Sequence, residues 1–284
     1  MTPHTDMSEC RRLLSHGSKS FYIASHFLPR ALRESASGLY AFCRIADDLV
    51  DLGDDPRQAL VSLHQRLDLI YDARPENHPI DRVLSQIVID HKLPRGLLDA
   101  LLAGFEWDTD GRDYNTLAEV CDYGARVAGT VGVMMAVLMG VKDRATLARA
   151  ADLGVAMQLT NIARDVLEDA EMGRRYLPAS WTGDVKPAHI AAASNAPDGE
   201  VAIAVSLAVR QLLLLADDFY QSGTAGLPYL PLRAHIAIAV AARIYRQIGM
   251  QIAATGYGWH QGRQVTSRVT KIICSLQACG SICR

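Results

Sequence analysis

The segment from residue 158 to residue 169 constrains the fold more than any other part of the chain. It contains neither proline nor glycine, and its residues have helical spacing. At about 100° per residue, its oxygen-bearing side chains fall on one stripe: Gln158, Asn161, Asp165 and Asp169. The surrounding helix is largely apolar, and a hard cation such as Mg2+ prefers oxygen ligands. A solvated face patterned for salt bridges explains a single stripe equally well.

A second acidic stripe, more than a hundred residues earlier, favours the cation site. It ends a helix predicted over residues 31–51 and consists of Asp47, Asp48 and Asp51. Each stripe holds two carboxylates at the i and i+4 positions, where like charges repel by about 0.2–0.5 kcal/mol. Both stripes occupy the last turn of their helices, where the helix dipole disfavours anions by roughly 0.3–1 kcal/mol. A cation shared between the two helices would offset both costs.

Basic residues are interleaved with these acids. Arg44 lies one turn before Asp47, and Arg164 directly precedes Asp165. Further polar residues follow the second stripe or form a separate cluster: Arg174, Arg175, Tyr176 and Ser18-Lys19-Ser20. Guanidinium groups suit the bidentate binding of phosphate oxygens. The combination predicts metal-assisted departure of diphosphate from an allylic carbon, inside an apolar cavity that protects the resulting carbocation.

Helical spacing dominates the rest of the chain, and the alternation typical of strands never lasts more than a few residues. We therefore expect an all-α fold in a single domain over residues 1–284. The expected helices cover about residues 5–15, 18–27, 31–51, 56–71, 80–91, 94–106, 117–139, 144–169, 200–221 and 232–254, with a last helix after Gly262. Residues 178–200 are rich in proline and are expected to be irregular. A calcium loop at residues 108–119 is rejected, because Arg112 stands where an oxygen ligand is required.

The composition excludes several classes of protein. A net charge of −2 over 284 residues and a low content of aromatic residues argue against nucleic acid as a partner. No segment reaches the roughly 18–20 apolar residues of a membrane span. Residues 1–20 do not resemble a signal peptide. The 6 cysteines include no CxxC pair, and we expect free thiols in a reducing cytosol.

Several sequence blocks are specific enough to indicate a family. They are Ser18–Phe21, Tyr40–Asp51, Val127–Gly132 and Gln158–Pro178. Over roughly residues 8–271 the chain resembles the phytoene synthase/squalene synthase family of head-to-head prenyl transferases. Its last block is most similar to bacterial phytoene synthases. The resemblance implies an all-α isoprenoid synthase fold, with helices around a central cavity that binds two diphosphates.

The resemblance also implies an activity, which is the condensation of two geranylgeranyl diphosphates through a cyclopropyl (prephytoene) diphosphate to phytoene, in carotenoid biosynthesis. The implied cofactor is Mg2+, with Mn2+ as an alternative, and no nicotinamide is expected. The implied ligands of the metal or of metal-bound water are Asp47, Asp48, Asp51, Asn161, Asp165 and Asp169. The implied diphosphate contacts are Ser18, Arg44, Arg164 and Arg263. The implied pocket residues near the reacting carbons are Tyr40, Gln158, Tyr176 and Tyr245. The residues expected to be catalytic are Asp47, Asp51, Asp165, Asp169, Tyr40 and Tyr245.

Two features depart from the family pattern. Tyr123-Gly124-Ala125 stands where the family often has Tyr-Cys-Tyr, so a tyrosine of the pocket wall is missing. The segment after about Thr270 is short and rich in cysteine.

Other functions remain open beside phytoene synthesis. A C30 synthase would make dehydrosqualene or squalene from farnesyl diphosphate, since cavity depth sets the chain length and no motif reports it. A non-catalytic helical subunit that binds prenyl lipid or a partner would be expected to lose acids from one stripe, whereas this chain keeps both. A head-to-tail prenyl transferase fits less well, because the second motif begins with Asn161 and not with an acid.

Substrate and product are long hydrocarbons in this interpretation. We therefore expect a cytoplasmic protein with transient peripheral contact on the inner face of the membrane. The apolar segment of residues 223–238 is the candidate contact surface. Contact with downstream carotenoid enzymes is a further expectation.

Overall fold

The structure, a computed structural model, describes residues 4–282, and within these residues every regular element is a helix. The α-helices are α1 (His4–Gly17), α2 (Lys19–Ser25), α3 (Arg30–Leu52), α4 (Pro56–Tyr71), α5 (Pro79–His91), α6 (Arg95–Thr109), α7 (Leu117–Gly124), α8 (Thr130–Leu138), α9 (Arg144–Glu171), α10 (Ala179–Thr182), α11 (Pro187–Ala193), α12 (Glu200–Thr224), α13 (Leu232–Ala254) and α14 (Arg268–Ile282). Short helical segments of other types are η1 (Ala125–Gly129), η2 (Leu227–Tyr229) and η3 (Trp259–Gln261). The expected all-α fold class is confirmed.

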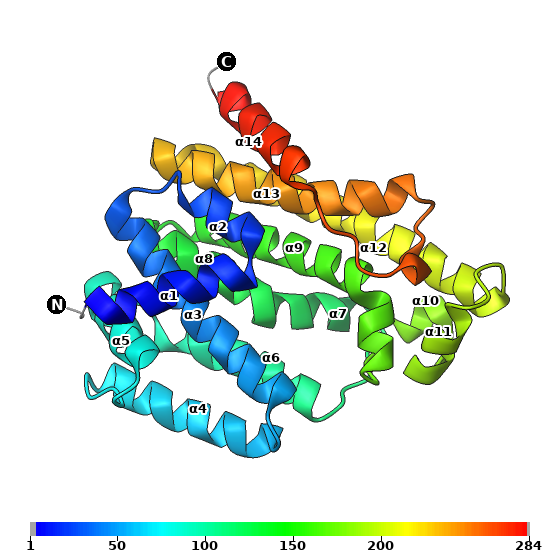
Figure 1. Cartoon of the computed structure of the whole chain (residues 1–284), viewed down its shortest axis with the longest axis horizontal. Helices are drawn as coiled ribbons and strands as arrows, with labels where there is room; N and C mark the ends of the chain where they lie inside the picture. Colours follow the sequence, from blue (N-terminus) through cyan, green and yellow to red (C-terminus); the bar gives the residue numbers. More distant parts are fainter. Residues whose placement is uncertain (1–3, 283–284) are drawn as a thin grey trace.

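The long helix α9 is the centre of the molecule (Figure 1). Its 28 residues would span about 42 Å at 1.5 Å per residue. It packs against α7, η1, α8, α11, α12, α13 and η3. The helices α3 to α6 form the other side of the molecule, and α14 lies against α13 at the top of the view (Figure 1). The predicted stripe on α9 is therefore carried by a helix that many other elements of the fold pack against.

Side-chain caps begin several of the helices. The Ser18 hydroxyl accepts a hydrogen bond from the Phe21 N–H at 3.2 Å and so begins α2. Asp55 caps α4, whose first residue is Pro56. Asp143 accepts a hydrogen bond from the Thr146 N–H at 2.8 Å at the start of α9. These local signals determine where α2, α4 and α9 begin.

The structure differs from the sequence expectation in two regions. The helix expected over residues 117–139 is interrupted by η1, a π-helical segment whose wider turn shifts the side chains that follow it. Residues 178–200 are not wholly irregular, because α10 and α11 form there. Pro187 occupies the first turn of α11, where the missing N–H of proline has no intrahelical partner to lose.

Glycine allows α9 to approach α8 and η1 closely. A Cβ atom on Gly132 of α8 would collide with the backbone carbonyl of Ala150, and one on Gly154 of α9 would collide with that of Ala128. The small residues of this region therefore serve tight helix packing.

Two large apolar clusters form the core. One surrounds α9 and α12, and the other joins α3, α4, α5 and α6. Val127 of η1 packs against both clusters. None of the helices in residues 4–282 is both long enough and apolar enough to cross a membrane. The cysteines that the structure describes are all free, and Cys283 lies outside the described residues.

Candidate active site

A cavity of about 720 Å³ lies between the two apolar clusters. Its depth is lined by apolar side chains and small residues of α3, η1, α8, α9 and α13, including Leu39, Val127, Val131, Met135, Leu153, Met157, Ile238 and Ala241. Its mouth is lined by charged and polar side chains of α3, α9 and the segments that follow α1 and α13. The cavity therefore joins a charged rim to a hydrocarbon-like interior.

The predicted site residues gather at this one cavity, although they come from segments far apart in the chain. Those that line it are Ser18, Tyr40, Arg44, Asp47, Asp51, Gln158, Asn161, Arg164, Asp165, Asp169, Tyr176, Tyr245 and Arg263. Asp48 does not line it. The Asp48 carboxylate instead accepts two hydrogen bonds from Arg44, at 3.0 Å and 2.5 Å.

At the end of α3, arginines neutralise the acids. Besides its bonds to Asp48, the Arg44 guanidinium lies 3.7 Å from the Asp47 carboxylate. The Arg174 guanidinium, which follows α9 in the chain, donates a hydrogen bond to Asp51 Oδ1 at 2.7 Å. Burial, followed by the charge of Asp51, raises the pKa of Asp47 to about 6.

At the end of α9, only one of the two acids is paired. Arg164 donates hydrogen bonds to both oxygens of Asp165, at 2.7 Å and 2.5 Å, and Arg263 Nε lies 3.5 Å from Asp165 Oδ1. The Asp169 carboxylate makes no hydrogen bond or ion pair with any residue that the structure describes. Burial and the neighbouring Asp165 charge raise the pKa of Asp169 to about 8.

The donor set of the mouth fits a hard cation. Asn161 Oδ1 is buried and accepts no hydrogen bond from the part of the chain that the structure describes, while Asn161 Nδ2 donates to Gln158 Oε1 at 3.3 Å. This orphaned oxygen and the unpaired Asp169 are on the same helix face, and oxygen is the ligand type that Mg2+ requires. Among the described residues, no three His, Cys, Asp or Glu side chains are placed to hold a metal on their own. A cation here would therefore need ligands from outside the protein, such as water and diphosphate.

Two lysines at the mouth extend the cationic rim. Lys19 Nζ donates to the Ser15 carbonyl at 2.8 Å, and Lys271 Nζ donates to the Thr266 carbonyl at 3.0 Å. Burial and the nearby charge of Lys19 lower the pKa of Lys271. Neither lysine has an acidic partner among the described residues. Sequence reasoning missed Lys271, since a single lysine in the cysteine-rich last helix carries no motif.

Aromatic rings line the cavity on two sides. Phe21 of α2 stacks on Tyr245 at 5.1 Å between ring centroids and meets Tyr40 edge-on at 6.3 Å. Burial raises the pKa of Tyr40 to about 12, so its hydroxyl stays protonated at neutral pH. On the other side, Tyr123 and Tyr176 stack at 4.9 Å. Tyr123 was not among the predicted site residues, because the resemblance drew attention to the tyrosine missing two positions later.

Asp108 is an acid that sequence reasoning did not count among the site residues, because it placed this acid in a loop after the helix expected at residues 94–106. It lies near the end of α6, lines the cavity and accepts hydrogen bonds from the hydroxyls of Tyr123 and Tyr176. Burial raises the pKa of Asp108 to about 6, although the tyrosine hydrogen bonds lower it. The signal that could have found it is an acid that continues the apolar helix face of Leu101 and Phe105 at helical spacing.

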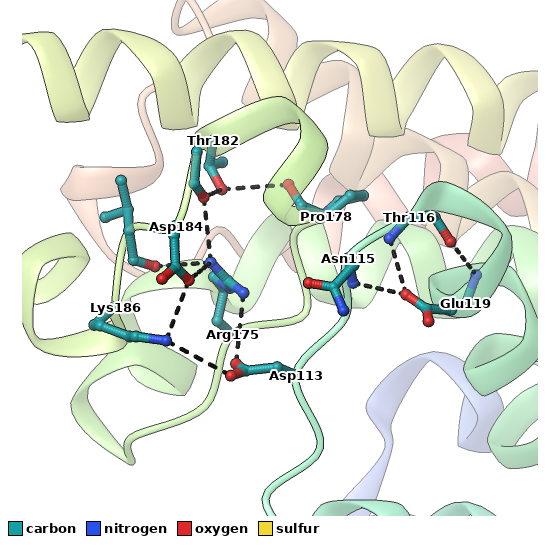
Figure 2. Close-up of polar contacts among 11 residues, drawn as sticks. Asp113, Asn115, Thr116, Glu119, Arg175, Pro178, Thr182, Asp184 and Lys186 are labelled. Atoms are coloured by element: carbon teal, nitrogen blue, oxygen red, sulfur yellow. Dashed lines mark hydrogen bonds and ion pairs between the residues drawn. The ribbon is translucent and has the colours of Figure 1, made fainter.

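The two arginines after α9 have different environments. Arg174 lines the cavity mouth, whereas the Arg175 side chain is 1% exposed and points into a loop network (Figure 2). There Arg175 donates to the carbonyls of Gly183 and Val185, at 3.3 Å and 3.0 Å, and pairs with Asp113 at 3.5 Å. Arg175 therefore holds together the loops around α10, and only Arg174 is available to a ligand in the cavity.

Comparisons with known proteins agree with this geometry. The family model described as squalene/phytoene synthase matches residues 14–270. A phytoene synthase of Cereibacter sphaeroides is 43% identical, covering 96% of this chain and 79% of the relative. A 15-cis-phytoene synthase of Enterobacter agglomerans is 41% identical, covering 93% of this chain and 92% of the relative. The crystal structure of a dehydrosqualene synthase has a TM-score of 0.86 and 27% sequence identity, covering 98% of this chain and 96% of that one.

Proposed function

This chain belongs to the squalene/phytoene synthase family, and we propose that it is a prenyl transferase that joins two geranylgeranyl diphosphates head to head to make phytoene. The observation that carries the proposal is the single cavity, in which an acid- and arginine-lined mouth opens into an apolar depth. A diphosphate requires the first part, and a long prenyl chain requires the second. The relatives that are named phytoene synthases support the product.

The proposed cofactor is Mg2+, held by the acids of both helix ends together with water and diphosphate oxygens. Asp47 and Asp51 would hold it from α3, and Asp165 and Asp169 from α9, with Asn161 Oδ1 as a neutral oxygen donor. Bound Mg2+ would neutralise the charge that builds up on the departing diphosphate. Asp48 is the weakest of the proposed ligands, because it does not line the cavity and its two oxygens accept hydrogen bonds from Arg44.

The cationic side chains of the mouth would bind the diphosphates. The guanidinium groups of Arg44, Arg164 and Arg174 each form an ion pair with an acid. Diphosphate would either replace that acid as the partner or bind to the N–H groups that the acid leaves free. Arg263 and the two lysines add charge on the α14 side of the mouth. Ser18 offers its hydroxyl from the same rim. These groups hold the substrate so that its allylic carbon points toward the apolar depth.

The aromatic and apolar wall would protect the carbocation that forms when the carbon–oxygen bond breaks. Tyr40, Tyr176 and Tyr245 line the cavity, and their ring faces attract cations. Over the full reaction two carbon–oxygen bonds break, two diphosphates leave and two protons are lost. Exclusion of water by the apolar lining prevents the cation from being captured as an alcohol.

A direct test incubates the purified chain with Mg2+ and either C20 or C15 diphosphate and identifies the products by chromatography. We expect phytoene from the C20 substrate without added nicotinamide, and no product when EDTA removes the metal. Product from the C15 substrate alone would overturn the proposal. That result would favour the C30 alternative, which the similarity to a dehydrosqualene synthase structure supports. A non-catalytic subunit would give no product from either substrate.

We further propose that residues 1–284 act as one domain.

We also propose that α14 makes transient contact with an anionic lipid surface. Several apolar side chains of α14 lie on the face opposite its packing side and are 49–68% exposed: Val269, Ile272, Ile273 and Leu276. The helix carries Arg268 and Lys271 and no acidic residue. The segment of residues 223–238 fits less well, because Leu227, Ala234 and Ala237 are buried.

Co-sedimentation with vesicles tests the lipid contact. We expect the chain to bind vesicles that contain phosphatidylserine better than vesicles of phosphatidylcholine alone. The double substitution Ile272→Glu and Leu276→Glu should abolish this binding. Ile203→Glu and Leu207→Glu on α12, which are exposed to similar extents, provide the matched control. Equal loss of binding in both double variants would refute the assignment to α14.

A further inference from the structure

Asp108 connects two cavity-lining tyrosines that come from distant parts of the chain. Its Oδ2 accepts a hydrogen bond from the Tyr123 hydroxyl of α7 at 2.8 Å. Its Oδ1 accepts one from the Tyr176 hydroxyl, in the segment after α9, at 2.7 Å. Each carboxylate oxygen thus holds the end of one aromatic ring.

The rings are packed as a unit around this carboxylate. Tyr123 and Tyr176 stack with an interplanar angle of 23°, and Tyr114 contacts them at 5.4 Å and 5.8 Å between centroids. Burial raises the pKa of both hydroxyls, so each keeps the proton that it donates. With both hydroxyls bonded, neither ring can swing about its Cα–Cβ bond without breaking a hydrogen bond. The stacking of the two rings restricts their rotation about the Cβ–Cγ axis, on which each hydroxyl oxygen lies.

The cluster lies where the lining of the cavity changes from charged to apolar side chains. Asp108, Tyr123 and Tyr176 line the cavity together with Asp47 and Asp169, the acids of the charged mouth. The negative charge of Asp108 contributes to the raised pKa of both Asp47 and Asp169, so Asp108 lies near these two acids. The apolar lining of η1 and α8 begins directly after α7 in the chain. The two rings therefore stand between the diphosphate end and the hydrocarbon end.

We propose that Asp108 is a positioning residue that fixes the faces of Tyr123 and Tyr176 beside the carbon from which diphosphate departs. The proposal rests on the function proposed above. Asp108 acts through the rings and not on the substrate. Two oxygens that each hold one hydroxyl give the rings a single arrangement, and cation stabilisation by a ring depends on the orientation of its face.

The experiment compares Asp108→Leu with Asp110→Asn in the full-length chain. Leucine keeps the branched shape of aspartate, with bulkier methyl groups in place of the two oxygens, and so removes both acceptors. Asp110 is the C-cap of the same helix and lies outside the cavity. Its one ion pair within residues 4–282 is with exposed Arg57, so it is the matched control. We expect Asp108→Leu to lower kcat by about 10- to 100-fold, with little change in KM. The control should keep wild-type kcat.

The same variants distinguish positioning from metal binding. The Mg2+ concentration for half-maximal activity should stay unchanged in Asp108→Leu, whereas Asp51→Asn should raise it. The share of substrate released as prenyl alcohol should rise in Asp108→Leu, because loosened rings protect the carbocation less well. An Mg2+ requirement that rises as it does in Asp51→Asn would overturn the proposal and make Asp108 a metal ligand.

A mutant cycle gives the decisive control. In a Tyr123→Phe/Tyr176→Phe background, Asp108 has nothing to hold, so Asp108→Asn should cost less than about threefold in kcat there and far more in the wild type. Equal costs in both backgrounds would refute the proposal. Near-UV circular dichroism reports the order of the stacked rings even in a chain without activity. An unchanged spectrum in Asp108→Leu would therefore count against positioning, whatever product the enzyme makes.

Discussion

The acidic ends of α3 and α9 have the same spacing but opposite electrostatic states. On α3, Asp48 and Asp51 are paired with Arg44 and Arg174. On α9, Asp165 is paired, whereas Asp169 has no hydrogen-bond or ion-pair partner within residues 4–282, and burial raises the pKa of Asp169 to about 8. Asn161 on the same helix adds an orphaned oxygen. The ligand-free chain therefore neutralises one end by itself and leaves the other end in need of positive charge.

This difference indicates that the two ends contribute differently to the proposed metal site. The α3 acids have alternative cationic partners, so losing a metal costs them little. The α9 end has no substitute for a cation at Asp169, and its carboxylate takes up a proton instead. Stability and metal response should consequently depend more on α9, while activity should depend on both ends.

The largest expected effect is on turnover. Asp47→Asn and Asp169→Asn each remove one carboxylate from the mouth while keeping the shape of the side chain. We expect each to lower kcat by at least about 10²- to 10³-fold, because stabilisation of the departing diphosphate is lost from either side. Product formation at saturating Mg2+ measures the effect, and circular dichroism checks folding. Near-normal activity in one variant would show that its helix end is dispensable.

The second largest expected effect is the stabilisation of the folded chain by bound Mg2+ and diphosphate. Mg2+ with inorganic diphosphate should raise the free energy of unfolding by about 2.7 kcal/mol when present at 100 times its dissociation constant. Thermal melts of the wild type and of Asp169→Asn measure the shift. We expect the substitution to remove most of it, while Asp48→Asn retains it, since Asp48 does not line the cavity. Loss of the shift in Asp48→Asn would restore that residue to the metal site.

The third effect is the pH dependence of the metal-free protein. Asp169 has a folded-state pKa of about 8, above its ordinary value of 3.8, so the folded chain binds its proton more tightly than the unfolded chain does. This contribution is present at low pH and is lost as the pH rises from the ordinary pKa toward 8. Asp169→Asn should raise the free energy of unfolding at pH 8.5 by on the order of 1–2 kcal/mol and flatten the pH profile. Urea denaturation at pH 6 and pH 8.5 in EDTA provides the comparison.

The smallest expected effect is on the free energy of unfolding, when the ion pair between the end of α3 and the segment after α9 is removed. Asp51→Asn removes the partner of Arg174, whose side chain is partly exposed, and should lower the free energy of unfolding by about 0.2–1 kcal/mol. Because the sign is opposite to that of Asp169→Asn, the two substitutions form an internal control. Stabilisation in both variants would mean that repulsion among acids, and not pairing with arginine, governs the α3 end.

Sequence periodicity and spacing determined the helices and the chemical character of the site. The bounds of α4 and α13 and the caps at Ser18 and Asp55 follow from local signals, because capping and proline placement act within one turn. The acid stripes on α3 and α9 are likewise properties of single helices. These features were predictable because each depends on residues close together in the chain.

Only the tertiary structure decided which groups meet. Asp108, Tyr123 and Tyr176 come from three segments, and no spacing in the sequence predicts that one carboxylate receives both hydroxyls. The same holds for Arg174 reaching Asp51 from the end of another helix while its neighbour Arg175 turns into a loop network. Unpaired Asp169 and paired Asp51 look alike in the sequence. Burial and long-range partners set their charge states, and both depend on how the helices pack around α9.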